Sequence, residues 1–101
     1  MMELELRRNR IRAGCMKEFL DAWLRGVVPL RRRFGFTFVG AWVFDDADEI
    51  VWILGYDGPD GFDHADGRYY ASPERALLDP DPAQWFESSE SARIRRVLDP
   101  G

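Results

Sequence analysis

The sequence has 101 residues, the size of one small domain spanning 1–101. Hydrophobic residues make up 46% of the chain and aromatic residues 14%, a composition that excludes intrinsic disorder and indicates a globular protein. No apolar run reaches the roughly 18 residues of a membrane span, and no secretion leader is recognisable, so we expect a soluble, cytoplasmic protein. A single cysteine, Cys15, excludes an intrachain disulfide and a cysteine-based zinc site.

The formal net charge of −4 is unevenly distributed along the chain. Basic residues dominate positions 1–40, and acidic residues dominate positions 41–101. This asymmetry fits either an anion-binding face or two solvated surfaces that attract each other within the fold or across a dimer. The second interpretation is favoured because an acidic protein is repelled by phosphate backbones. Lys17 is the only lysine among fourteen basic residues, which is typical of a GC-rich bacterial genome.

The N-terminal third of the sequence predicts one strand and one long helix. Alternation of apolar and polar residues predicts the strand over residues 3–12. A single apolar stripe at helical spacing predicts a helix over residues 15–35. Pro29 should bend or restart this helix, and Gly35 is a natural C-cap.

The remaining sequence predicts three strands and a second main helix. Apolar runs at 36–44 and 50–56 read as strands joined by the polar hairpin loop 45–49. One Ser-Pro pair and one Asp-Pro pair each indicate an N-cap followed by proline at the start of a short helix. The further predicted elements are a helix at 60–72, short helical pieces from Ser72-Pro73 and Asp81-Pro82, and a strand at 92–98.

The element order predicts an α+β ferredoxin-like fold, βαββαβ, with a four-stranded antiparallel sheet. Alternation in the central strands places small, β-branched side chains on one face and large aromatic ones on the other. Both faces are apolar, yet the two main helices cover only one of them. A bare aromatic face would be adhesive on a monomer, so we expect a second copy to cover it in a face-to-face homodimer.

Four stretches of the sequence resemble the NIPSNAP family of the dimeric α/β-barrel superfamily. They are "ELR" at Glu5–Arg7, "FGF…GAW" at Phe34–Trp42, "VWILGYDG" at Val51–Gly58 and "YYASPER" at Tyr69–Arg75. The resemblance implies that two sheets pack into a barrel, with a pocket inside each protomer. It also implies kinship with cofactor-free monooxygenases, isomerases, lyases, polyketide cyclases and some haem enzymes. Similar proteins often read E-L-R-x-Y, whereas this chain has Asn9 where they have the tyrosine.

The first strand predicts a polar site on the aromatic face of the sheet. Glu5, Arg7 and Asn9 alternate onto that face, and a few polar groups between apolar walls are typical of a small-molecule site. The alternative is that Glu5 and Arg7 form an ion pair that only fixes the register of the dimer. The predicted apolar walls of this pocket are Phe38, Trp42, Trp52 and Tyr56.

We therefore predict that the protein binds a small hydrophobic or aromatic molecule. If it catalyses a reaction, the chemistry is cofactor-free isomerase, cyclase, lyase or monooxygenase chemistry. Arg7 would hold an anionic or enolate oxygen, with Glu5 orienting it. Tyr69 or His64 would transfer the proton, although His64 is better explained as a surface residue of its helix. The alternative function is a non-catalytic, dimeric interaction module.

Other site types are not expected. The acidic cluster between Asp57 and Asp66 fails the calcium-loop spacing, because Pro59 occupies a ligand position and no glutamate closes the loop. Residues 32–41 superficially match an RNA-binding strand, but Phe34 interrupts the pattern and the domain is acidic. The sequence thus implies no metal, no cofactor, and no nucleic-acid or membrane partner.

Overall fold

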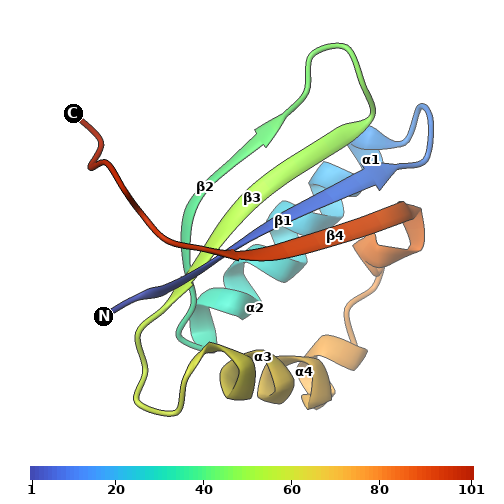
Figure 1. The fold of residues 1–101 in the computed structure, drawn as a ribbon. Helices are drawn as coiled ribbons and strands as arrows, with labels where there is room; N and C mark the ends of the chain where they lie inside the picture. The colour runs from blue at the N-terminus through green and yellow to red at the C-terminus, as the bar shows by residue number, and fades with distance from the viewer.

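The computed structural model describes residues 1–101 and contains one antiparallel four-stranded sheet, with strand order β2-β3-β1-β4. The helices pack against one face of this sheet, as Figure 1 shows. This is the ferredoxin-like arrangement, so the predicted fold class is confirmed. The strands are β1 (Glu3–Ile11), β2 (Thr37–Val43), β3 (Glu49–Tyr56) and β4 (Phe86–Ile94), and the helices are α1 (Met16–Ala22), α2 (Val28–Arg33), α3 (Phe62–Ala71) and α4 (Pro73–Ala76).

The first helical segment runs without a break from α1 to α2 through a π-helical turn, η1 (Trp23–Val27). Pro29 lies two residues after the end of this turn and has no N–H to donate to the preceding turn. The wider π turn accommodates the proline without ending the helix. Gly35 follows the last helical turn with φ of 92°, a left-handed conformation that favours glycine, as predicted for the C-cap.

The predicted last strand, 92–98, is wrong in position, because β4 begins six residues earlier. β4 is an edge strand paired with β1, with Ser89 opposite Asn9 and Ser91 opposite Arg7. Most of its side chains are exposed, so its sequence lacks the apolar alternation that marks a half-buried strand. Two of the four apolar residues in the predicted range, Val97 and Leu98, lie in the C-terminal segment, which leaves the sheet (Figure 1).

A β-bulge in β2 overturns the predicted position of Trp42. Phe38 is opposite Leu54 but Gly40 is opposite Ile53, so one extra residue enters the strand between them. Beyond the bulge every side chain changes face relative to the simple alternation. Trp42 therefore lies on the uncovered face of the sheet, where it is 54% exposed.

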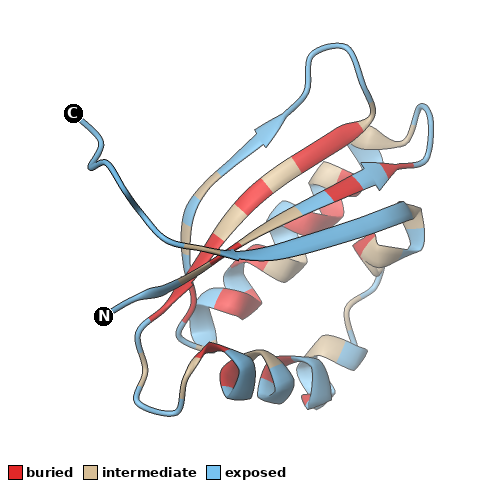
Figure 2. Ribbon diagram, in the orientation of Figure 1, coloured by how far each residue is buried: buried red, intermediate tan, exposed pale blue.

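The prediction that the aromatic face is bare is also wrong. Trp52, Leu54 and Tyr56 of β3 are buried, and this face is the one that the helices cover (Figure 2). The reason is aromatic packing from the first helical segment: the rings of Trp23 and Trp52 lie 5.3 Å apart. The uncovered face carries the smaller aliphatic side chains of Leu4, Leu6, Val51 and Ile53.

One end of the sheet is tied to α3 by a polar cluster. The hydroxyl of Tyr56 donates a hydrogen bond to Asp60 at 2.6 Å, and Arg68 forms an ion pair with the same carboxylate. The hydrogen bond from Tyr56 is the main cause that lowers the pKa of Asp60 below its ordinary value of 3.8.

We predict that this cluster contributes an acid-sensitive part of the stability. Because the folded-state pKa of Asp60 is depressed, its contribution is present above the unfolded pKa and disappears as the pH falls through the folded value. Denaturant unfolding at pH 6, 4 and 3 should show a shallower acid loss in Asp60→Asn than in the parent. Asp57→Asn, an exposed neighbour, is the control, and equal slopes in all three proteins would contradict the assignment.

Candidate functional site

Arg7 lies near the middle of β1, on the face of the sheet that the helices cover. Its guanidinium donates to Glu5 at 3.2 Å, to the hydroxyl of Tyr70 at 3.0 Å and to Asp66 at 3.0 Å. Burial by itself lowers the pKa of Arg7, but Tyr70, Asp66 and Glu5 together outweigh it and raise that pKa above its ordinary value. Arg7 is therefore a fixed cation inside the fold.

A second guanidinium, that of Arg31, lies even deeper. Arg31 is 2% exposed, and its guanidinium donates a hydrogen bond to the other carboxylate oxygen of Asp66 at 2.6 Å. The guanidinium carbon lies 3.8 Å from the ring centre of Tyr69, within cation–π range. Asp66 of α3 thus bridges a cation from β1 and a cation from α2.

A cavity with two lobes lies between the sheet and the helices around these cations. The smaller, inner lobe has a volume of about 40 Å³, and the outer lobe has about 230 Å³. The two lobes share four lining residues: Arg7, Trp52, Tyr70 and Phe86. The inner lobe is also lined by Trp23, Val27, Arg31, Tyr69, Arg75, Pro82 and Ala83, and the outer lobe by Asn9, Ser89, Glu90 and Ser91.

Three buried polar atoms have no hydrogen-bond partner, and all three belong to residues that line this cavity. They are Oδ1 of Asn9, the hydroxyl of Tyr69 and Nε of Arg75. Buried polar atoms in folded proteins are almost always hydrogen-bonded to protein, ordered water or a ligand, so three unpartnered ones at one cavity indicate a place for a polar occupant. Burial raises the pKa of Tyr69, although Arg31 and Arg75 oppose the shift, so its hydroxyl is a neutral donor at physiological pH.

The structure brings some of the predicted site residues together at this cavity. Arg7, Tyr69, Asn9 and Trp52 all line it. Glu5 is buried beside Arg7 and accepts a hydrogen bond from its guanidinium, a contact that both the orienting role and the structural ion pair predict.

Four other predicted residues lie elsewhere. Phe38 packs edge-on against Trp23, with ring centres 5.5 Å apart, and does not line the cavity. Tyr56 is bound to Asp60 at the end of the sheet. Trp42 is on the uncovered face, and His64 is exposed on α3.

Sequence reasoning missed several residues that the fold supplies to the site. Arg31 is the first of three consecutive arginines in the last turn of α2, and nothing local distinguishes it from the other two. Asp66 and Tyr70 are four positions apart on α3, so their spacing places them on one side of the helix. That signal, read together with Tyr69, could have identified them. The missed residues that line or support the cavity are Arg31, Asp66, Tyr70, Arg75 and Phe86.

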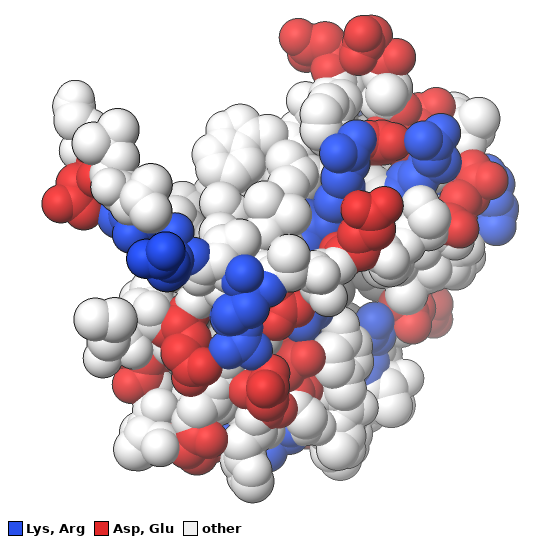
Figure 3. Space-filling view, viewed as in Figure 1, with Lys and Arg blue, Asp and Glu red and all other residues white.

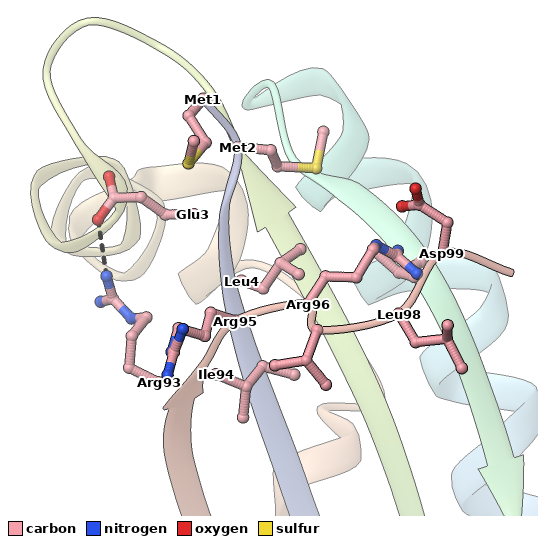
Figure 4. A pocket seen from close by; sticks show the side chains of 12 residues that line it. Met1, Met2, Glu3, Leu4, Arg93, Ile94, Arg95, Arg96, Leu98 and Asp99 are labelled. Atoms are coloured by element: carbon pink, nitrogen blue, oxygen red, sulfur yellow. Dashed lines mark hydrogen bonds and ion pairs between the residues drawn. The ribbon is translucent and has the colours of Figure 1, made fainter.

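A larger groove, of about 790 Å³, lies where the two chain ends meet (Figure 4). Met1, Met2 and Leu4 line one part, and the C-terminal segment from Arg93 to Asp99 lines another. Arg93 is tied to Glu3 by an ion pair of 2.7 Å. No predicted site residue lines this groove, which is bounded by exposed terminal segments.

No group of three or more His, Cys, Asp or Glu side chains is placed to hold a metal ion. None of the helices has the length and apolar character needed to cross a membrane.

Comparison with known proteins gives matches among solved structures. An uncharacterised NIPSNAP domain protein from Burkholderia xenovorans is 23% identical, with a TM-score of 0.82 over 100% of both chains. A NIPSNAP family protein from Agrobacterium tumefaciens is also 23% identical, with a TM-score of 0.81 over 94% of this chain and 92% of that one. An antibiotic biosynthesis monooxygenase is 15% identical, with a TM-score of 0.68 over 97% of this chain and 100% of that one.

No protein-family model matches the sequence, and no curated protein matches it either. At these identities the structural matches establish the fold. The NIPSNAP resemblance predicted from the sequence is thus confirmed in three dimensions: this chain has the ferredoxin-like fold of the NIPSNAP domain proteins.

Proposed function

We propose that this chain is a NIPSNAP-family protein that forms a homodimer and binds one small hydrophobic or aromatic molecule in each protomer. The binding site is the two-lobed cavity between the sheet and the helices. The observation that carries this proposal is the set of three unpartnered polar atoms, on Asn9, Tyr69 and Arg75, around that cavity. Aromatic walls with a few convergent polar groups are what a small-molecule site requires.

The same residues are suited to chemistry that needs no cofactor. A neutral Tyr69 hydroxyl donates a hydrogen bond or a proton to a ligand oxygen, and Arg7 stabilises negative charge that develops on that oxygen. Proton transfer of this kind serves isomerase, cyclase and lyase reactions, and oxygenation of an activated carbanion. The alternative, a non-catalytic interaction module, is favoured by one observation: Arg7 and Arg31 are already paired with carboxylates.

The uncovered sheet face supports the homodimer. The chain exposes 6586 Å², about 700 Å² more than the roughly 5,900 Å² expected for a folded monomer of this mass. Figure 3 looks onto this face, where uncharged atoms gather over β2 and β3. Two of its charged residues are paired in part, because Arg8 and Arg10 both contact Glu49.

Filling the outer lobe tests the binding function. Ser91 lies beside Arg7 in the sheet and lines the outer lobe, so Ser91→Phe should occupy the space that a ligand ring needs. We expect saturation-transfer NMR with phenol, indole, benzoate and 4-hydroxybenzoate to detect binding to the parent. The variant should bind these probes at least about tenfold more weakly, a loss of roughly 1.4 kcal/mol.

The matched control is Ala71→Phe, which adds the same ring at an exposed position of α3 that does not line the cavity. Ala71→Phe should bind the probes as the parent does. If no probe binds the parent, or if Ser91→Phe binds them unchanged, the cavity is not the ligand site and the interaction module is the better description.

A further inference from the structure

We infer that the ligand is an aromatic carboxylate that carries a hydrogen-bond donor, an OH or NH group, on its ring system. The carboxylate enters the inner lobe and the donor meets Asn9 in the outer lobe. This inference rests on the proposed small-molecule function and adds to it the chemical class and the orientation of the ligand.

The charge around the inner lobe selects an anion. Three guanidiniums line this lobe, those of Arg7, Arg31 and Arg75, and no carboxylate lines it. The carboxylates that pair with these cations, on Glu5, Asp66 and Asp81, lie outside the lining. A ligand group in the inner lobe therefore faces cations directly and carboxylates only behind them.

The two unpartnered groups of the inner lobe can both donate a hydrogen bond, and the Arg75 Nε–H can only donate. Nη2 of Arg75 donates to Asp81 at 3.1 Å, which leaves its buried Nε–H without an acceptor. The hydroxyl of Tyr69, in a residue only 1% exposed, has no partner either. The Nε–H of Arg75 requires an acceptor and the Tyr69 hydroxyl can donate to one, and a carboxylate supplies two acceptor oxygens in the plane that guanidinium groups recognise.

The volumes of the two lobes determine which lobe holds the carboxylate and which holds the aromatic ring. The inner lobe, at about 40 Å³, is too small for an aromatic ring, since a cavity that binds benzene has a volume of roughly 150 Å³. A carboxylate fits there. The outer lobe, at about 230 Å³, holds a ring between the aromatic side chains of Trp52, Tyr70 and Phe86.

Asn9, in the outer lobe, determines which hydrogen-bonding group the other end of the ligand must carry. Its Nδ2 donates to the hydroxyl of Ser89 at 2.6 Å and to the backbone carbonyl of Ser88 at 3.5 Å. A carbonyl only accepts, so these contacts fix the orientation of the amide and make Oδ1 the atom without a partner. Oδ1 accepts only, and the ligand must therefore bring a donor.

Three probes of one shape test the inference by titration calorimetry on the full-length protein. They are 4-hydroxybenzoate, 4-hydroxybenzamide, which lacks the charge, and benzoate, which lacks the ring donor. We expect 4-hydroxybenzoate to bind the tightest, with the amide at least about tenfold weaker, because hydrogen bonds to charged groups are worth roughly 1.5–3 kcal/mol. Benzoate should be about fivefold weaker, for the loss of one neutral hydrogen bond.

Three variants assign each preference to a residue. Arg75→Gln should remove the advantage of the acid over the amide. Asn9→Leu should weaken 4-hydroxybenzoate but leave benzoate unchanged. Tyr69→Phe deletes only a hydroxyl that has no partner in the free protein, so it should keep the melting temperature of the parent while weakening the acid about tenfold. It therefore separates a binding role from a structural one.

The two proposals fail differently. If the amide binds the parent as tightly as the acid, with binding still lost in Ser91→Phe, the carboxylate inference is overturned and the binding function stands. If Asn9→Leu weakens benzoate as much as 4-hydroxybenzoate, the donor assignment is overturned. If no probe binds the parent, both proposals fall.

Discussion

Replacing Asp66 with alanine should lower the free energy of unfolding by about 3–5 kcal/mol, the cost of leaving a buried charge without its partner. Asp66 is bound by Arg31 at 2.6 Å and by Arg7 at 3.0 Å. The Arg31 side chain is only 3% exposed, so it cannot regain hydration when the carboxylate is removed. Its guanidinium would keep the stacking contact with Tyr69 but lose its only hydrogen bond. Urea unfolding followed by tryptophan fluorescence measures this loss.

The same helix provides the control for Asp66. Asp63 also forms an ion pair, with Arg93, but its side chain is 91% exposed. Exposed pairs contribute little because water and salt screen them, so Asp63→Ala should change the free energy of unfolding by less than about 1 kcal/mol. Similar losses in both variants would show that Asp66 is not a bridge between buried cations, and would weaken the description of the site as a cationic cavity.

Replacing Ile53 with glutamate should convert the proposed homodimer to a monomer. Ile53 lies on the uncovered face, paired with Leu6 of β1 and with Gly40 of β2. A carboxylate there would be buried without a partner against the second copy, which costs several kcal/mol. We expect the dissociation constant to rise at least about a hundredfold, or roughly 2.7 kcal/mol, in sedimentation equilibrium.

Leu24→Glu is the matched control for Ile53. Leu24 is an exposed aliphatic residue of η1, on the helical side of the molecule, so this change adds the same charge away from the uncovered face. Its association should equal that of the parent. A parent chain that sediments as a monomer at every concentration would remove the homodimer from the proposed function.

The elements that local pattern specifies were predictable. Apolar alternation identified β1 and placed Arg7 and Asn9 on the same face, because side-chain direction in a strand follows residue number. Ser72 caps α4 by accepting a hydrogen bond from the backbone N–H of Arg75 at 3.1 Å, as the Ser-Pro pair indicated. These features depend only on neighbours a few positions away.

The predictions that the structure overturned concern features that depend on contacts between distant parts of the chain. β4 is a strand because β1 pairs with it, and its own exposed sequence contains little that favours a strand. Trp42 changed face because one extra residue entered β2, and no apolar pattern marks a bulge. Which face the helices cover depended on the packing of Trp23 against Trp52, a contact between distant elements.

The sequence by itself therefore determined the order of the elements, the ferredoxin-like class and the presence of a buried arginine on the first strand. Only the tertiary structure decided the composition of the cavity. Asp66 is separated from Arg7 by 59 positions and from Arg31 by 35, and no local pattern relates them. Such a site exists because the fold brings three arginines to one small space. Burial there raises the free-energy cost of each polar group that lacks a hydrogen-bond partner.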